Sequence, residues 1–227
     1  MTPVSDGVPA ALLVIAKAPV AGRVKTRLTP PCTPEQAAGL AAAALADTLA
    51  AVAAAGGAGR RRVLALDGEP GPWIPPQFEV IPQRGEGFAM RLAAAFADVG
   101  QPALLVGMDT PQLSADLLEA GLAALEGADV DAVFGPALDG GYWAIGLRAA
   151  DERVFAGVPM SVDETGAAQR ASLEALGLCV ADLPPLSDVD TIEDARAVAA
   201  AAPGTAFATA MTEIDAALGD AVLGAPA

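Results

Sequence analysis

Short apolar runs alternate with amphipathic stretches along most of this sequence. The apolar runs have the length of buried strands, and they span 11–15, 62–66, 78–81, 103–106, 131–135, 142–147 and 178–183. Between them, apolar residues recur at helical spacing, and we expect helices over 34–55, 87–99, 114–125, 165–176, 191–201 and 208–223. Because strands and helices alternate, the pattern predicts a largely parallel sheet with helices on both faces.

The chain has 227 residues, which is enough for one large α/β domain. It contains no internal repeat and no long linker, so a single domain is favoured over two small ones. We therefore predict an α/β fold with a doubly wound, mostly parallel sheet over residues 11–201, preceded by a tail at 1–10. Residues 202–227 are expected to form a C-terminal helix and tail that pack on the body or on a partner.

Two of the expected helices carry more specific signals. Thr33 and Gln36 have the spacing of a capping box, which marks the start of the first helix. In the second helix, Phe88, Leu92 and Phe96 lie on one face. We interpret that face as a core-packing surface and not as a cofactor site.

The composition is typical of a soluble, tightly packed protein. Hydrophobic residues make up 53% of the chain and aromatic residues 4%, and alanine dominates. The most apolar stretch, 37–55, is mostly alanine and contains Asp47, so we interpret it as a soluble helix and not as a membrane span. No basic region precedes an apolar run at the N-terminus, so no secretory signal is visible and a cytoplasmic location is expected.

No histidine occurs in the chain. Nucleophilic systems that depend on a histidine base are therefore excluded, as is zinc bound by histidine. Cys32 and Cys179 have neither a metal-binding spacing nor a disulfide pattern, and we expect two free thiols. Chemistry is left to carboxylates, lysine, arginine, hydroxyls and a recruited metal ion.

The charged residues are distributed unevenly. The formal net charge of −15 argues against binding to nucleic acid or to an anionic membrane, because like charges repel. Nine of the 13 basic residues lie before residue 100, whereas 20 of the 28 acidic residues lie after it. The two lysines of the chain, Lys17 and Lys25, both follow the first predicted strand, close to Arg23 and Arg27.

This basic loop is a candidate phosphate site. Four cations surround a turn that contains Gly22, at the end of a strand where ligands of α/β proteins commonly bind. The alternative is an ordinary surface loop whose cations pair with nearby acids. Lys25 and Thr26 resemble the end of a Walker A loop, but Val24 stands where that motif requires glycine, and no Gly-x-Gly-x-x-Gly fingerprint occurs.

Asp109 is the first candidate for chemistry. It lies in the sequence GMDTPQL, directly after the apolar run 103–106. Because that run is a predicted strand, Asp109 is expected at the C-terminal edge of the sheet. The alternative is that Asp109 turns or caps the chain before the helix that starts near Ser114.

A second candidate is the turn that contains Asp139, Gly140 and Gly141. Two successive glycines allow a backbone to approach a ligand closely or to take a positive φ. An Asp-Gly pair is also a strong signal for an ordinary hairpin, so both interpretations stay open.

A third group of acids lies before the helix predicted over 191–201. Asp188 and Asp190 occur there in the sequence SDVDTIED, where aspartate commonly serves as a helix cap. If Asp109 and Asp190 instead meet at the sheet edge, they would hold Mg²⁺ or Mn²⁺ together with phosphate oxygens. Such an ion would join the acidic half of the chain to the phosphates held by its basic half.

Four motifs, AKAPVAGRVKTRL, GMDTPQL, GPALDGGYWAIGL and LSDVDTIEDA, occur in this order. Together they resemble the DUF2064 group of glycosyltransferase-A-like proteins, also described as radical-SAM/selenodomain-associated or arsenosugar-type transferases. The resemblance runs over residues 11–198 and implies the fold of molybdenum-cofactor and phospholactate nucleotidyltransferases. Family members often carry Trp-Ser-Thr where this chain has Met160, Ser161 and Val162.

The resemblance also implies roles for individual residues. Asp109 would be the principal metal ligand and Asp190 the second, and the turn from Asp139 to Tyr142 would face the sugar or the acceptor. The implied substrate-binding residues are Asp139, Gly140, Gly141 and Tyr142. The implied phosphate-binding residues are Lys17, Gly22, Arg23, Lys25, Thr26 and Arg27.

The leading hypothesis is a metal-dependent glycosyltransferase that uses a nucleoside-diphosphate sugar and a small-molecule acceptor. Asp109, Lys25 and Asp139 are the expected catalytic residues, with Asp139 as the base if the anomeric centre inverts. The alternative is a nucleotidyltransferase that releases pyrophosphate, in which Lys25 and Arg27 neutralise charge in the transition state. A third possibility is a nucleotide-binding protein without turnover. The sequence does not identify the base, the sugar, the acceptor or the oligomeric state.

Overall fold

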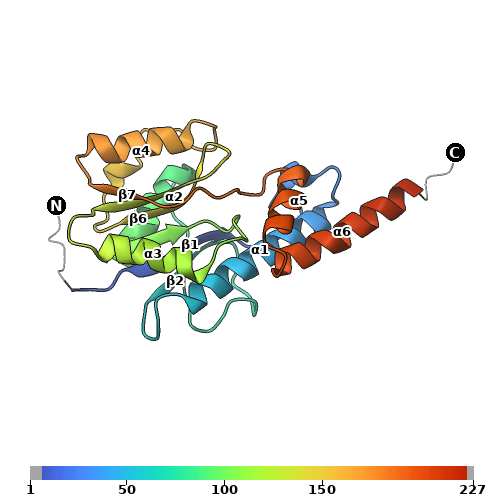
Figure 1. The fold of residues 1–227 in the computed structure, drawn as a ribbon, viewed down its shortest axis with the longest axis horizontal. Coiled ribbons are helices and arrows are strands. Elements are labelled where there is room, and N and C mark those ends of the chain that lie inside the picture. The colour runs from blue at the N-terminus through green and yellow to red at the C-terminus, as the bar shows by residue number, and fades with distance from the viewer. Residues whose placement is uncertain (1–6, 224–227) are drawn as a thin grey trace.

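The computed structural model describes residues 7–223, and its centre is a seven-stranded sheet with the order β3-β2-β1-β4-β6-β5-β7. Figure 1 shows this sheet with helices packed around it. The strands are β1 (Ala11–Lys17), β2 (Arg62–Asp67), β3 (Glu79–Pro82), β4 (Ala103–Val106), β5 (Ala132–Pro136), β6 (Tyr142–Leu147) and β7 (Val180–Asp182). Each expected strand is present, with its ends within a few residues of the prediction.

Strand β6 alone runs against the direction of the other strands. It pairs antiparallel with both β4 and β5, whereas β1, β2, β3 and β4 pair parallel with one another, as do β5 and β7. The reason is local, since a short turn after β5 returns the chain directly as β6 and leaves no room for a crossover helix. The predicted doubly wound, mostly parallel sheet is therefore confirmed.

Helices cover both faces of the sheet. One face carries α1 (Pro34–Ala54) and α3 (Ala115–Glu126), and the other carries α2 (Gly87–Val99) and α4 (Thr165–Ala175). Short 3₁₀ helices at Thr26–Leu28 and Glu152–Val154 were not expected from the sequence. They are too short to show a period, which is why the pattern of apolar residues does not indicate them.

Helix α1 begins at the predicted capping box. Thr33 accepts a hydrogen bond from the Gln36 backbone, and the Gln36 side chain accepts one from the Thr33 backbone. By length and composition α1 is the one helix among the described residues that is apolar enough to cross a membrane. More than half of its most apolar window is buried within the protein, as in the core helix of a globular domain.

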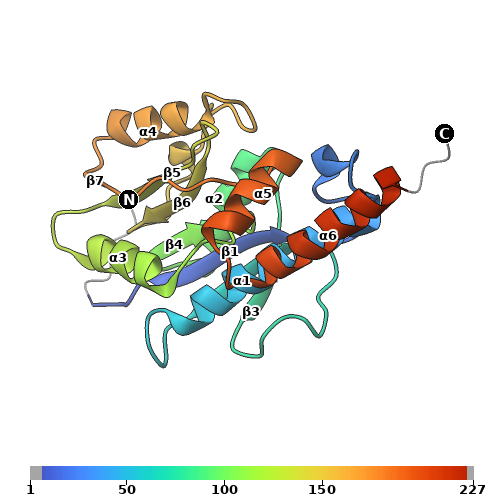
Figure 2. The same cartoon turned by 45° about the vertical axis from the view of Figure 1, so that its right-hand side comes forward.

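Helices α5 (Ile192–Ala201) and α6 (Ala206–Leu223) form a third layer on the outer side of α1. Both views show α6 lying along α1 and extending beyond the sheet (Figures 1 and 2). Phe207, Met211 and Ile214 of α6 are buried in a cluster with Leu40 of α1 and Val198 of α5. The predicted C-terminal helix thus packs on the body. Parts of the expected tails, residues 1–6 and 224–227, lie outside the described residues.

Candidate functional site

A cleft of about 740 Å³ opens at the C-terminal edge of the sheet. Its walls come from the loop after β1, the start of α2, the loop after β4, the β5–β6 turn and the segment before α5. Ligands of open α/β sheets bind at this edge because neighbouring strands send their loops to opposite faces there. The basic loop and the acidic residues Asp109, Asp139, Asp188 and Asp190 all reach this cleft.

The basic loop forms one wall of the cleft. Lys17, Arg23, Thr26 and Arg27 are exposed and line it. Among the described residues, Lys17 and Arg23 have no acidic partner within salt-bridge distance, so their charges face the cleft. Gly22 has a φ of 74°, which suits glycine, and turns the chain within this loop.

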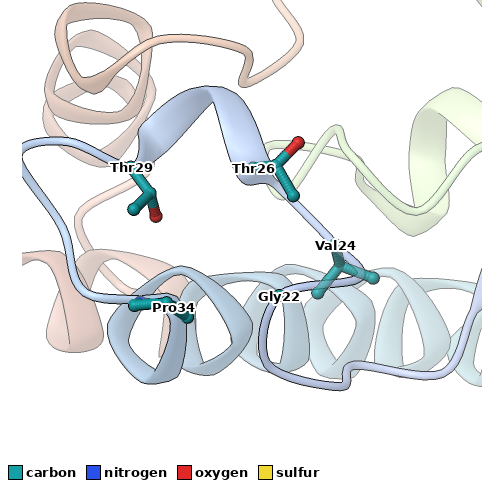
Figure 3. A pocket seen from close by; sticks show the side chains of 5 residues that line it. All are labelled: Gly22, Val24, Thr26, Thr29 and Pro34. Atoms are coloured by element: carbon teal, nitrogen blue, oxygen red, sulfur yellow. The ribbon is translucent and has the colours of Figure 1, made fainter.

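Gly22 does not line the large cleft. It borders a smaller cavity of about 260 Å³ between the loop and the start of α1, together with Val24, Thr26, Thr29 and Pro34. Figure 3 shows these five side chains around the bend of the loop. Most of this lining is apolar, and the cations Lys17, Arg23, Lys25 and Arg27 line the large cleft and not this cavity.

Lys25 is the one cation of the loop that is nearly buried, with a side chain 9% exposed. Its Nζ lies 3.0 Å from Asp109 Oδ1 and 3.7 Å from Asp190 Oδ1, and it donates a hydrogen bond to the Val189 carbonyl. Arg27 also pairs with Asp190. Lys25 and Arg27 thus pair with nearby acids, as the alternative interpretation of the loop expects.

The backbone of Lys25 lies in the left-handed region, with φ 48°. Ser161 is the other described non-glycine residue with a positive φ, and it also lines the cleft. Such conformations cost on the order of 1–3 kcal/mol and occur preferentially at functional sites. Two separate walls of the cleft thus carry local backbone strain.

Asp109 follows β4 and opens into the cleft, with a side chain 41% exposed. It does not cap the following helix, because the Ser114 side chain accepts the hydrogen bond from Leu117 that caps α3. Its partner is Lys25, so the structure gives Asp109 a place in the cleft and not the role of a helix cap.

The turn that contains Asp139 is a hairpin between β5 and β6. Asp139 Oδ1 accepts a hydrogen bond from the Gly141 backbone at 2.9 Å. Gly140 has a φ of 91°, and a Cβ atom there would lie 2.0 Å from the Asp163 carbonyl oxygen. The close approach that Gly140 permits is therefore to the backbone before α4, and Gly140 does not line the cleft, whereas Asp139 and Gly141 do.

Tyr142 lines the cleft, but its hydroxyl is turned to the protein. The hydroxyl donates to Gln169 Oε1 at 3.3 Å, and the ring packs against Phe134 with centroids 5.5 Å apart. Burial raises the pKa of the Tyr142 hydroxyl far above its usual value. Tyr142 is thus a neutral residue of the cleft lining whose hydroxyl is already engaged by Gln169.

Three aspartates that line the cleft lie close together. Oxygen atoms of Asp139, Asp188 and Asp190 lie within 4.8 Å of one another. Burial and the neighbouring charges of Asp139 and Asp190 raise the pKa of the Asp188 carboxyl to about 7. Asp188 was not predicted as a site residue, although its Asp-x-Asp spacing to Asp190 was the available signal.

Helix α5 does not use these aspartates as caps. The Thr191 side chain accepts a hydrogen bond from the Asp194 backbone, and the Asp194 side chain accepts one from the Thr191 backbone. Since this capping box satisfies the helix end, Asp188 and Asp190 are left for the cleft. The predicted pair of metal ligands, Asp109 and Asp190, is bridged by Lys25, and Asp109 is not part of the cluster.

An apolar edge completes the cleft. Phe88 was expected to pack into the core together with Leu92 and Phe96, but its side chain is 43% exposed and lines the cleft, which corrects that prediction. The reason is its position in the first turn of α2, beyond the part of the helix that packs on the sheet. Met160 and Val162 line the cleft as well.

The residues present fit a divalent cation. The cluster supplies carboxylate oxygens from three aspartates, and Mg²⁺ and Mn²⁺ prefer such ligands. Thr110 follows Asp109 and lines the cleft, and its hydroxyl is buried with no hydrogen-bond partner within residues 7–223. A bound ion with its waters, or a phosphate, would provide coordination for the carboxylates and a hydrogen-bond partner for the Thr110 hydroxyl.

Solved structures of other proteins share the fold of this chain. A protein from Desulfovibrio desulfuricans G20, provisionally described as a nucleotide-diphospho-sugar transferase, is 25% identical, with a TM-score of 0.81 over 93% of this chain and 97% of that one. A cytidylyltransferase from Leptospira borgpetersenii is 10% identical, with a TM-score of 0.54 over 83% of this chain and 84% of that one. CMP:2-keto-3-deoxy-manno-octonic acid synthetase complexed with CTP is 12% identical, with a TM-score of 0.51 over 85% of this chain and 99% of that one.

These likenesses confirm the predicted superfamily, that of the nucleotide-diphospho-sugar transferases, and its transferase fold. No curated protein matches the sequence. Residues 37–162 match the family model of DUF2064, described as an uncharacterized protein conserved in bacteria. This range contains the motifs around Asp109 and Asp139, while the basic loop and the Asp188–Asp190 motif lie outside it. Because the match covers more than half of its length, the chain belongs to the DUF2064 family.

Proposed function

We propose that this protein is a metal-dependent glycosyltransferase that uses a nucleoside-diphosphate sugar and a small-molecule acceptor. The observation that carries the proposal is the arrangement of charge in the cleft, where a wall of cations faces a cluster of aspartates. A diphosphate bound to a divalent cation has the complementary pattern, since its oxygens suit the cations and its metal ion suits the carboxylates.

The basic loop is proposed to hold the phosphates. Lys17 and Arg23 face the cleft without acidic partners in the described part of the chain, and Arg91 on α2 adds a further cation. Arg91 is held by Asp67 at 3.0 Å, which fixes its direction. These cations would stabilise the diphosphate as it leaves the sugar, because charge develops on its oxygens in the transition state.

Asp139, Asp188 and Asp190 are the residues proposed to hold the metal ion, with Asp109 beside them. When bound, a divalent cation withdraws charge from the departing diphosphate. The aspartates have a second effect, since they repel anions and so direct the phosphates of the donor towards the basic loop. Asp109 is one residue from Thr110, whose unpartnered hydroxyl is available to a ligand at the same point.

The acceptor is proposed to bind at the apolar edge of the cleft. Phe88, Met160 and Val162 line the cleft, which also contains Asp139 of the aspartate cluster. Apolar side chains beside carboxylates favour an uncharged acceptor with an apolar face. Asp139 would take the proton from its hydroxyl if the reaction inverts the anomeric centre.

A nucleotidyltransferase is the second candidate. The observation that favours it is the number of cations in the cleft, where Lys17, Arg23, Arg27 and Arg91 suit a triphosphate at least as well as a diphosphate. In that reaction an acceptor phosphate attacks the α-phosphate and pyrophosphate leaves.

The released product distinguishes the two reactions. The protein is first screened by thermal shift with Mn²⁺ against nucleoside triphosphates and nucleotide sugars. The stabilising ligands are then incubated with mixed acceptors while nucleoside diphosphate and pyrophosphate are measured. We expect nucleoside diphosphate from a nucleotide sugar. Pyrophosphate released from a triphosphate in the presence of an acceptor would overturn glycosyl transfer in favour of the second candidate.

A further inference from the structure

We infer that Lys25 acts as an internal counter-ion of the carboxylates in the cleft, and that a divalent cation must displace Lys25 before the lysine can contact phosphate. This inference rests on the proposed function and adds a sequence of events within the same site. Lys25 would then couple binding of the metal ion to binding of the nucleotide donor. The metal ion would release Lys25 from its carboxylates, and the released Lys25 would bind the phosphates of the donor.

The first support is the position of the Lys25 ammonium group. It contacts Asp109 at 3.0 Å, lies 3.7 Å from Asp190 and donates to the Val189 carbonyl. These partners come from the loops on two sides of the cleft, after β4 and before α5. A single ammonium group thus joins carboxylates that would otherwise repel one another.

The second support is that Lys25 shares Asp190 with the aspartate cluster. An ion bound by Asp139, Asp188 and Asp190 would neutralise the part of the attraction on Lys25 that comes from Asp190, while Asp109 stays outside the cluster. The ion would also place two positive charges near the ammonium group, and like charges at short distance repel. Lys25 and the metal ion therefore compete for Asp190.

The third support is the difference between Lys25 and the other lysine. Lys17 is exposed in the same cleft and has no acidic partner among the described residues, whereas the Lys25 side chain is 9% exposed. The lysine side chain has a long, flexible stem, so Lys25 is able to leave its partners without a change in the backbone. Its neighbours Arg23 and Thr26 already border the space into which it would move.

The chain offers a direct test, because Lys17 and Lys25 are its two lysines. An amine-acetylating reagent is applied at low dose, and modification of each lysine is measured by mass spectrometry with and without Mn²⁺, in the absence of nucleotide. We expect Lys17 to react readily in both conditions. Acetylation of Lys25 should rise several-fold relative to Lys17 when Mn²⁺ is added.

Three variants control this experiment. In Asp188→Asn the rise at Lys25 should be lost, because the ion has lost one of its ligands. Calorimetry with Mn²⁺ alone should show tighter binding to Lys25→Met than to the wild type, and a smaller gain for Lys17→Met, which removes the same charge without breaking an ion pair.

The outcomes separate this inference from the proposed function. If Mn²⁺ binds but Lys25 acetylation stays constant or falls, the inference is overturned while metal-dependent transfer stands. Equal gains in Mn²⁺ affinity for the two lysine variants would overturn it as well. If Mn²⁺ does not bind the wild type at all, both this inference and the metal-dependent function fail.

Discussion

Asp188 shows how a single side chain escapes prediction from sequence. An aspartate before a helix is most often a cap, and the sequence alone supports that interpretation. In the structure Thr191 and Asp194 satisfy the helix end, and Asp188 lies among the carboxylates of Asp139 and Asp190. The contacts that decide its role join segments about 50 residues apart, and local pattern carries no information on them.

The raised pKa of Asp188 gives a prediction at this scale. Its pKa is about 7 in the folded protein, against an ordinary value of 3.8, so folding favours the protonated form. Without metal, stability is therefore lost as pH rises from about 4 through 7. We expect Asp188→Asn to be more stable than the wild type at pH 8 by about 2 kcal/mol, half of the full effect of such a shift, because the group is partly exposed.

Urea unfolding in the presence of a chelator measures this difference. The gain from Asp188→Asn should shrink as the pH is lowered and vanish below about pH 4, where both states of the wild type carry the proton. Asp116→Asn is a suitable control, because Asp116 is an exposed aspartate at the start of α3, away from the cleft. A variant less stable than the wild type at pH 8 would contradict the account.

At the scale of elements, the apolar pattern predicted the helices and strands well because each buries one face or one continuous run. At Gly140–Gly141 the sequence left both a hairpin and a ligand-binding turn open, with the Asp-Gly pair favouring the hairpin. The structure shows a hairpin whose Gly140 packs against the Asp163 backbone, and the backbone amide of Gly166 donates to the Gly140 carbonyl at 2.7 Å. Such a contact between distant segments cannot be seen in the sequence.

Replacement of this glycine tests the contact. Gly140→Ala would place a Cβ atom 2.0 Å from the Asp163 carbonyl oxygen and strain a φ of 91°. Gly157→Ala is the matched control, since Gly157 has a φ of 73° and open space around its Cβ position. We expect Gly157→Ala to cost about 1 kcal/mol and Gly140→Ala about 3 kcal/mol or more in unfolding free energy. Equal losses would show that the turn is free to move away from α4.

At the scale of the whole molecule, helix α6 is joined to the body by α1. The side chain of Asp47, within α1, accepts hydrogen bonds from the backbone amides of Ala206 and Phe207 at 2.9 and 2.8 Å. Asp47 thus caps a helix that begins about 160 residues later. From the sequence alone, Asp47 was only evidence against a membrane span. A cap supplied by a distant helix cannot be recognised from the residues next to the start of α6.

Loss of this cap should loosen the C-terminal layer. We expect Asp47→Ala to lower the unfolding free energy by about 1–2 kcal/mol and to increase hydrogen exchange in α6 while leaving the sheet protected. Glu213→Ala, which changes an exposed acid of α6, is the control and should have little effect. Unchanged exchange in α6 of Asp47→Ala would contradict the assigned role.

The fold also accounts for the uneven distribution of charge along the chain. The basic loop belongs to the N-terminal half and the aspartate cluster to the C-terminal half, and the topology brings both to one edge of the sheet. The sequence predicted that they would meet, since strand ends share an edge. It could not predict that Lys25 crosses the cleft to Asp109 and Asp190.

Calorimetric titration of nucleoside diphosphates into the protein, with and without Mn²⁺, tests most directly whether the cleft joins a metal ion to nucleotide phosphates. We predict that at least one diphosphate binds at least tenfold more tightly with Mn²⁺, and that Asp190→Asn abolishes this gain. Binding that is equally strong with and without Mn²⁺, or a gain that survives in Asp190→Asn, would contradict the proposed site.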